Sequence, residues 1–481
     1  MLMNVELPTE WHNDFHSMLE QFQASLTLSD AVDASGKIWF IEQLSDSVFI
    51  YQLAQVWLGS QFAFDWCKRQ PDWLISLLRA GTIDHAPDVT ILQSLAEQAN
   101  DEASLMQVLR RFRQRAMLHI IWRDITRRAT TLQTTAALTA LADMCIQQAV
   151  DFLYPRLCAE FGTPCNDSGV PQSFLVIGMG KLGAFELNLS SDIDLIFAYD
   201  ESGETIFADT RSATLPPSQH NGNRRSILNR DFFTRLGQKL ILVIDKLTAD
   251  GFVFRVDMRL RPYGDSGALA LNYDAMEQYY QQQGRDWERY AMIKARLIYG
   301  DSQQAAPLMD MLRRFTYRRY LDFSAIDALR DLKRQIEREM AKRGMNDNIK
   351  LGKGGIREIE FIVQSFQLIH SGRDSDLQPA PVIAMLSMLE SKDLLSADDV
   401  AKLQSAYFFL RNVEHLLQAW RDEQTQMLPH DPIQQARTAW LMGYNNWLEF
   451  SDALQVHRDA VQQIFSAVIT SQSDNVTETQ H

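Results

Sequence analysis

The spacing of hydrophobic residues divides the chain into helical segments and one segment of short strands. Over residues 1–150, apolar positions recur every three or four residues, as in Leu105, Val108, Leu109 and Phe112, and Gly and Pro are few. This periodicity is typical of amphipathic helices. We therefore expect a helical amino-terminal region.

Short apolar runs replace this periodicity between residues 171 and 300. The runs SFLVIG, DIDLIFAY and FVFRVDMRL are rich in Val, Ile and Phe, and turns containing Gly separate them. Such runs predict β-strands. The helical pattern returns after residue 303, where Ser324 and Asp327 indicate the start of a helix.

This order of elements predicts an α+β chain that is mostly helical, with a small mixed β-sheet core flanked by helical domains. The expected divisions are a helical region at 1–150, the sheet-bearing core at 151–302, a helical domain packing on the core at 303–425, a helical linker region at 426–470 and a polar tail at 471–481.

Charge and composition narrow the class of protein. The 481 residues carry 61 acidic and 47 basic side chains, a net charge of −14, and no block of Lys and Arg stands out. Such a protein repels a polyanion, which argues against a nucleic-acid substrate. No uninterrupted apolar run reaches the roughly 18 residues of a membrane helix, and the start has no signal-peptide pattern. We expect a cytoplasmic protein without a membrane segment and with free thiols at its four cysteines.

The segment FLVIGMGKLGAFELNLSSDIDLIFAYD, residues 174–200, holds the most informative pattern. Side chains alternate along a strand, so Asp192 and Asp194 project from one face while Ile193 and Leu195 enter the core. Two adjacent carboxylates repel each other unless a cation neutralises them, and Mg²⁺ binds carboxylate and phosphate oxygens. The pair therefore predicts a magnesium clamp. The alternative is a solvated edge strand with two exposed acids.

A dinucleotide site is the competing interpretation of the same segment. Gly178, Gly180 and Gly183 have the spacing G-x-G-x-x-G, and Asp200 follows them. That fold needs a crossover helix of at least about ten residues between two parallel strands. Only about eight residues separate Gly183 from Asp192. We therefore expect no dinucleotide binding.

A third carboxylate lies in the run FVFRVDMRLRP. If this run is a strand, one of its faces carries Arg255, Asp257, Arg259 and Arg261. Asp257 would complete a metal site or handle a proton, and the arginines would bind phosphate oxygens with bidentate geometry. The alternative is a ladder of ion pairs between strands.

The second helical region contains two further groups. In GGIREIEFIVQ, Arg357, Glu360 and Gln364 lie along one face of an expected helix. A functional role for Glu358 or Glu360 and a purely structural role are the two alternatives. His415 stands alone in the helical stretch RNVEHLLQ. A structural role is the simpler interpretation for a lone helical histidine.

These motifs resemble a known superfamily. Gly178, followed a dozen residues later by Asp192-Ile-Asp194-Leu, and the run RVDMRLRP are similar to the signature of the DNA polymerase β nucleotidyltransferases. Met179 departs from that signature, which usually has Gly or Ser there. Within the superfamily, the chain resembles the bifunctional glutamine synthetase adenylyltransferase and adenylyl-removing enzymes. The matching segments are GMGKLGAFELNLSSDIDLIF, TADGFVFRVDMRLRPYGDSG, QGRDWERYAMIKARLIYGD and GKGGIREIEFIVQ.

The resemblance implies a function, partners and cofactors. Family members are similar to two tandem copies of this catalytic unit, and only one SSDIDL occurs here, which indicates the amino-terminal half. In the family, that half removes the adenylyl group from a glutamine synthetase tyrosine by phosphorolysis and releases ADP, whereas the other half adenylylates with ATP. The implied partners are adenylylated glutamine synthetase, the nitrogen-signalling protein PII, inorganic phosphate and ADP, with two Mg²⁺ ions as cofactors.

The resemblance also implies roles for individual residues. The catalytic and metal-binding residues would be Asp192, Asp194 and Asp257, and those near nucleotide or phosphate would be Gly178, Ser191, Arg259, Arg261, Lys294 and Arg296. Lys294 and Arg296 would reach phosphate from a neighbouring helix, and a solvated helix face is the alternative for them.

Two other functions stay open. An ATP-dependent adenylyltransferase or a uridylyltransferase acting on a signalling protein would use the same carboxylates. A non-catalytic regulatory module would bind a nitrogen-signalling protein through its helical domains.

Overall fold

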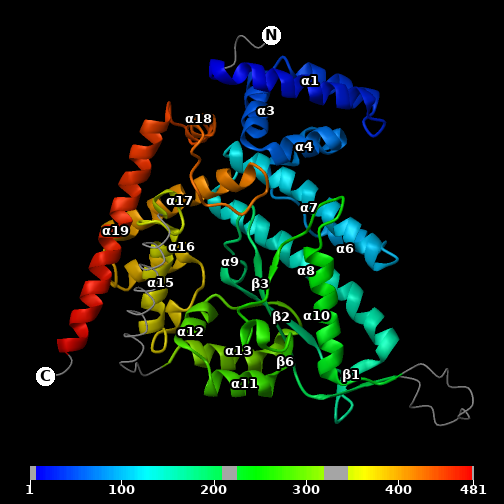
Figure 1. The fold of residues 1–481 in the computed structure, drawn as a ribbon, viewed down its shortest axis with the longest axis vertical. Helices are drawn as coiled ribbons and strands as arrows, with labels where there is room; N and C mark the ends of the chain where they lie inside the picture. Colours follow the sequence, from blue (N-terminus) through cyan, green and yellow to red (C-terminus); the bar gives the residue numbers. More distant parts are fainter. Residues whose placement is uncertain (1–6, 208–224, 319–344, 479–481) are drawn as a thin grey trace, which may run out of the picture.

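Helices make up most of the described chain, and a small sheet lies among them (Figure 1). The computed structural model describes residues 7–207, 225–318 and 345–478. The helices before the sheet are α1 (His12–Leu28), α2 (Ala34–Gln43), α3 (Ser47–Gly59), α4 (Gln61–Arg69), α5 (Pro71–Arg79), α6 (Ile91–Ala96), α7 (Glu102–Ile125) and α8 (Thr131–Phe161). Those within and after it are α9 (Gly180–Gly183), α10 (Asn229–Asp245), α11 (Tyr273–Gln282), α12 (Asp286–Met292), α13 (Ser302–Thr316), α15 (Ile356–His370), α16 (Val382–Ser391), α17 (Ala397–Ala419), α18 (Pro432–Leu441) and α19 (Trp447–Glu478).

The central sheet is small and mixed, which confirms the predicted α+β class. Its strands are β2 (Phe174–Met179), β3 (Ile193–Tyr199), β5 (Val256–Asp257), β6 (Ala270–Asn272) and β7 (Arg296–Tyr299). Strand β2 pairs antiparallel with β3 and β7, whereas β5 and β6 both pair parallel with β3. A separate two-stranded ribbon joins β1 (Thr163–Asn166) to β4 (Gly203–Ile206).

The antiparallel pairing of β2 and β3 excludes the dinucleotide-binding fold, which needs parallel strands. The glycines between these strands serve close packing instead. Gly180 has φ +55°, and a Cβ there would lie 2.5 Å from an oxygen of Asp194. A Cβ at Gly183 would lie 1.7 Å from the carbonyl oxygen of Lys294. The glycine turn therefore lets the backbone approach the acidic strand and the segment before β7.

Both faces of the sheet are covered by helices, so the strand residues alternate between two cores. Val176 and Leu195 pack into a core that includes residues of α8 and α10. Ile177 and Ile196 pack into another core, with residues of α11 and α13. Ile193 and Leu195 are buried, as the strand pattern predicts. The sheet is thus the middle layer of this part of the molecule (Figure 1).

A third core lies in the carboxyl-terminal helices, where α19 packs along α15 and α17 (Figure 1). Helix α19 continues to Glu478, into the segment whose polar composition predicts a tail. The segment 203–226, where the composition predicts a surface loop, begins with β4, and its residues 208–224 lie outside the described ranges. The start of the helix expected at Ser324 also lies outside them.

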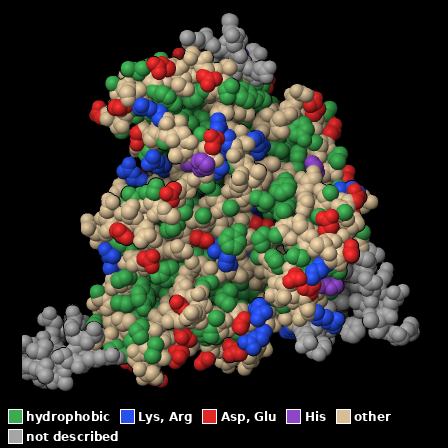
Figure 2. Space-filling model, turned by 180° about the vertical axis from the view of Figure 1, so that it is seen from behind, with side chains coloured by type: hydrophobic (Ala, Val, Ile, Leu, Met, Phe, Trp, Pro, Cys, Tyr) green, Lys and Arg blue, Asp and Glu red, His purple; other side chains and the backbone are tan. Residues whose placement is uncertain are grey.

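Helix α8 is long and apolar enough to cross a membrane by length and composition, but 67% of its most apolar window is buried inside the protein. Its apolar residues serve the core between the amino-terminal helices and the sheet. On the face seen from behind, acidic, basic and hydrophobic side chains are interspersed (Figure 2). That face therefore carries no broad field of one charge.

Candidate active site

The three carboxylates predicted to act together line one cavity of about 420 Å³. Asp194 lies in β3 and Asp192 directly precedes it. Because β3 and β5 are parallel, their register places Asp257 beside Asp194. The sheet therefore brings Asp257, from a distant segment of the chain, next to Asp192 and Asp194.

Close packing of these acids changes how they ionise. Burial and the charges of Asp257 and Asp192 raise the pKa of Asp194 to about 6. The hydrogen bonds from Arg259 hold the pKa of Asp257 below its usual value. The mutual repulsion expected from the sequence is thus present, and it falls on Asp194.

Asp192 is held by side chains from two separate segments. Arg255 donates from Nε to Asp192 over 2.9 Å and from Nη2 to Ser190 over 3.0 Å. Gln424, after α17, donates to the other carboxylate oxygen over 3.2 Å. The position of Asp192 therefore depends on both the sheet and the carboxyl-terminal helices.

The predicted strand around Asp257 is wrong beyond two residues. Strand β5 contains only Val256 and Asp257, and the chain then turns. The backbone N–H of Arg259 donates to Asp257 over 2.8 Å, and its guanidinium folds back onto the same carboxylate. Arg261 points elsewhere, donating to the carbonyl of Met258 over 2.7 Å, and does not line the cavity. The predicted alternation of three arginines on one strand face fails because this turn redirects them.

The remaining predicted contacts divide into two groups. Ser191 and Lys294 line the cavity, although Lys294 lies in the turn after α12 rather than in a helix. Arg296 begins β7 and forms two hydrogen bonds of 2.9 Å with Asp143, outside the cavity lining. Gly178 lies inside β2 and is also absent from the lining.

Several lining residues come from the carboxyl-terminal region. Arg357, Glu360 and Gln364 all line the cavity from α15, as their common helix face allowed. Lys350 and Lys181 also line it, and sequence reasoning missed both. The only signal for them was their place in the glycine-containing segments GKLG and NIKLGKGG.

Buried ion pairs fix part of this wall. Lys181, on α9, lies 3.0 Å from Glu414 on α17. Lys294 lies 2.7 Å from Glu360 and 3.3 Å from Glu186. All five side chains are buried or nearly so. The pairs Lys181–Glu414 and Lys294–Glu360 therefore join the segments around the sheet to the carboxyl-terminal helices at the cavity wall.

His415 has the structural role that its isolation suggested. It is fully buried, and its Nδ1 lies 3.0 Å from a carboxylate oxygen of Asp124. The four cysteines are free thiols.

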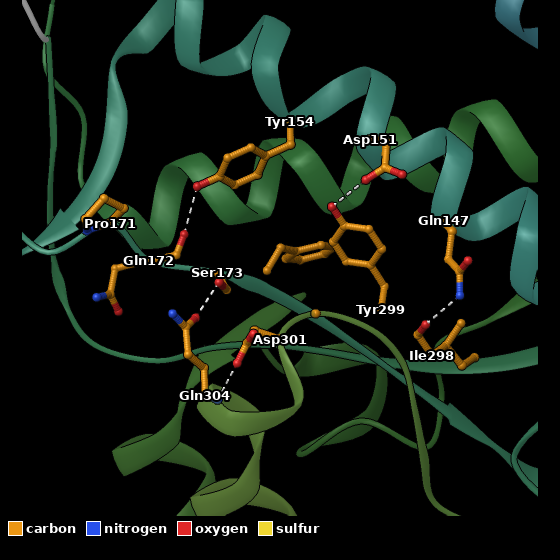
Figure 3. A pocket seen from close by; sticks show the side chains of 12 residues that line it. Gln147, Asp151, Tyr154, Pro171, Gln172, Ser173, Ile298, Tyr299, Asp301 and Gln304 are labelled. Carbon is orange, nitrogen blue, oxygen red and sulfur yellow. Dashed lines mark hydrogen bonds between the residues drawn. The ribbon is translucent and has the colours of Figure 1, made fainter. Parts of the chain in front are cut away.

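A second cavity of about 470 Å³ offers different chemistry (Figure 3). Its twelve lining residues include no Lys, Arg or His. Tyr299 donates to Asp151 over 2.8 Å, and Tyr154 donates to the carbonyl of Gln172 over 2.8 Å, as Figure 3 shows. Several of its polar groups pair with each other, and no lining side chain carries a positive charge for a phosphate.

The acids suit a divalent metal by donor type, since hard cations bind carboxylate oxygens. Within residues 7–207, 225–318 and 345–478, however, no group of three His, Cys, Asp or Glu side chains is already arranged as a metal site. Arg259 covers Asp257, and its side chain is 73% exposed. A metal that binds all three acids would therefore compete with Arg259 for the oxygens of Asp257.

Comparisons with known proteins agree with the geometry. A family model for glutamate–ammonia ligase adenylyltransferase matches residues 50–311, and one for GlnD PII-uridylyltransferase matches residues 330–469. Three similar proteins are each named bifunctional glutamine synthetase adenylyltransferase/adenylyl-removing enzyme. That of Pseudomonas putida is 51% identical over 88% of this chain, that of Pseudomonas aeruginosa 49% over 94%, and that of Nitrosococcus oceani 48% over 90%. The matches span only 42–44% of the length of these relatives. With the first model matching more than half of its residues, the chain belongs to the glutamate–ammonia ligase adenylyltransferase family.

Proposed function

We propose that this chain removes the adenylyl group from a tyrosine of adenylylated glutamine synthetase by phosphorolysis. The observation that carries the proposal is the cavity in which three carboxylates face basic side chains. Relatives about half identical to the chain are named for adding and removing adenylyl groups. Acids that hold metal and bases that hold phosphate are the groups that such a transfer needs.

The reaction joins two anions, so the site must neutralise charge. An oxygen of hydrogen phosphate attacks the α-phosphorus in line with the phenolic oxygen. The bond from phosphorus to the tyrosine oxygen breaks, and the proton of hydrogen phosphate ends on the phenol. The products are ADP and unmodified tyrosine. Basic side chains on the α15 side of the cavity offset the charge that gathers on the phosphate oxygens, and Ser191 offers a hydroxyl donor near them.

Asp192, Asp194 and Asp257 are the residues that would hold Mg²⁺. Bound there, Mg²⁺ supplies positive charge and polarises the attacking and leaving oxygens. The protein's own contribution is to keep Asp192 and Asp194 in place, through Arg255, Gln424 and the β3–β5 register.

The experiment is to mix the chain with adenylylated glutamine synthetase and Mg²⁺, with and without inorganic phosphate, and to identify the released nucleotide. We expect ADP, formed only with phosphate. AMP released at a rate independent of phosphate would identify a hydrolase and overturn the proposal.

The second candidate is forward transfer, favoured by the match of residues 330–469 to a PII-uridylyltransferase model. In that case the chain would label unmodified glutamine synthetase with ATP, or PII with UTP. Radiolabelled ATP and UTP distinguish these reactions, and we expect neither to label protein.

A further inference from the structure

The basic side chains around the cavity differ in how far the protein already neutralises them. Lys294 pairs with two glutamates, and Lys181 pairs with Glu414. Arg259 is committed to Asp257. These three cations therefore have carboxylate partners within the chain.

Lys350 differs from them. It is half-buried and lines the cavity, yet its ammonium group has no ion pair or hydrogen bond with any other described residue. Its charge still acts on two buried acids, since it lowers the pKa values of Glu360 and Glu414. Lys350 is thus a cation beside the carboxylates that retains its capacity to bind an anion.

The backbone that carries Lys350 is firmly held. The side chain of Asn348 accepts hydrogen bonds from the N–H of Lys350 over 2.9 Å and of Leu351 over 2.7 Å. Arg458, on α19, donates to the carbonyls of Asn346 over 2.7 Å and Asn348 over 2.9 Å. A fixed backbone with an unpaired terminal charge is the arrangement of a preorganised binding group.

Close packing holds the other end of this loop. Gly354 has φ +68°, and a Cβ there would lie 2.2 Å from the carbonyl oxygen of Arg458. The N–H of Ile349 also donates to the carbonyl of Gln426 over 3.0 Å, and Gln426 itself lines the cavity. The loop is therefore placed by α19 and by the segment after α17, not by the catalytic sheet.

We propose that Lys350 binds the non-reacting oxygens of the incoming inorganic phosphate and so makes phosphate, rather than water, the acceptor of the adenylyl group. The proposal rests on the proposed function. A neutral water molecule gains little from this ammonium group, whereas a dianion gains a charge-assisted hydrogen bond. The reacting bonds and the proton are those of the phosphorolysis described above, and Lys350 itself exchanges no proton.

The kinetic test compares Lys350→Gln and Lys350→Arg with Lys353→Gln. Lys353 lies in the same loop but is exposed and outside the cavity lining, so it is a matched control. Initial rates of ADP release are measured against phosphate concentration, at fixed Mg²⁺. We expect Lys350→Gln to raise the KM for phosphate about tenfold or more, as loss of a hydrogen bond to a charged group does. The KM for adenylylated glutamine synthetase should stay within about twofold, Lys350→Arg should retain most of the phosphate affinity, and Lys353→Gln should match the wild type.

A second measurement uses the wild-type chain, so it does not depend on a variant that folds. Lysines are acetylated briefly with acetic anhydride and quantified by mass spectrometry, with and without inorganic phosphate. Phosphate should protect Lys350 and leave Lys353 unprotected. An unchanged KM for phosphate in Lys350→Gln, or no protection of Lys350, would overturn this proposal alone. Loss of the phosphate requirement in the wild type would instead overturn the proposed function.

Discussion

The position of Asp194 among three acids lowers the stability of the folded chain at neutral pH. In the folded chain the carboxyl group of Asp194 keeps its proton up to about pH 6, because its pKa is about 6 and not the ordinary 3.8. Deprotonation therefore costs the folded state free energy as pH rises through this window, because the folded state binds more protons there than the unfolded chain. We expect Asp194→Asn to raise the free energy of unfolding by about 1–3 kcal/mol at pH 7 without added metal, and by about half as much at pH 5. Denaturant titrations at the two pH values measure both effects.

The same substitution should abolish turnover, because it removes a predicted metal ligand. Asp265→Asn is a suitable control, since Asp265 is 82% exposed and lies outside the cavity lining. Near-normal turnover of Asp194→Asn at saturating Mg²⁺ would contradict the metal-binding role of this acid.

Arg259 would compete with a divalent metal for the carboxylate of Asp257. Arg259 is mostly exposed and folds back onto Asp257. Removing it should strengthen Mg²⁺ binding a few-fold, because the metal no longer displaces an ion pair. Arg261→Ala is the matched control, since Arg261 does not line the cavity. The Mg²⁺ affinities are obtained from the thermal unfolding temperature measured at increasing Mg²⁺ concentrations. Equal Mg²⁺ affinities of Arg259→Ala and Arg261→Ala would show that no competition exists.

Among the elements, strand alternation was a reliable guide only where a strand is long. Along β3, burial of Ile193 and Leu195 and the position of Asp194 follow from it. In the run FVFRVDMRLRP the same rule misplaced Arg261, because β5 ends after two residues. The turn is favoured by the hydrogen bonds of Arg259 to Asp257, a local competition that periodicity does not register.

A buried ion pair between Arg113 and Asp422 links the amino-terminal helices to the cavity. Arg113 on α7 donates to both carboxylate oxygens of Asp422 over 2.6 and 3.0 Å, and its guanidinium lies 5.2 Å from the ring centroid of Phe252. Asp422 has φ +56° and lies two residues before Gln424, which donates to Asp192. We therefore expect Arg113 to act as a positioning residue for Asp192.

Asp422→Asn tests the role of this ion pair, since Asn tolerates a positive φ but lacks the charge of Asp. The variant leaves Arg113 buried without a counter-ion, so we expect a loss of about 3 kcal/mol of stability. If Asp192 also shifts, kcat should fall several-fold while the KM for phosphate changes little. At a lower temperature, where the variant is fully folded, its kcat should stay low. A folded Asp422→Asn variant with wild-type kcat would show that the ion pair stabilises the fold but does not position Asp192.

At the scale of the whole molecule, the cavity is built from segments far apart in the chain. The acids come from the sheet and were found from local spacing. Lys350, Glu360 and Gln424 come from the carboxyl-terminal region, from α15 and from the segments before it and after α17, and nothing in their local sequence says which part of the protein they will face. Their placement depends on how α15, α17 and α19 pack, which is decided by long-range contacts.

The buried pair of Lys181 and Glu414 joins the sheet to that helical packing. Although burial alone would raise it, the charges of Lys181, Arg411 and Lys350 lower the pKa of Glu414 to about 2. The unfolded value is near 4.5, so the folded state gains stability from the ionised Glu414 above that pH. This contribution is lost as pH falls from about 4.5 towards 2.

Glu414→Gln should therefore lower the free energy of unfolding by about 3–5 kcal/mol at pH 7, because it leaves Lys181 buried beside an uncharged partner. The α15–α19 helices should then unfold before the sheet, and thermal unfolding should separate into two steps. Glu423→Gln, at an exposed position shortly after α17, should change stability by less than about 0.5 kcal/mol. Calorimetry between pH 3 and pH 7 measures these effects. The difference between wild type and Glu414→Gln should narrow as pH falls below 4.5, since the unfolded wild-type chain then binds a proton at Glu414 that the folded chain does not. A difference that stays constant over this range would show that lost packing, and not lost charge, separates the two proteins.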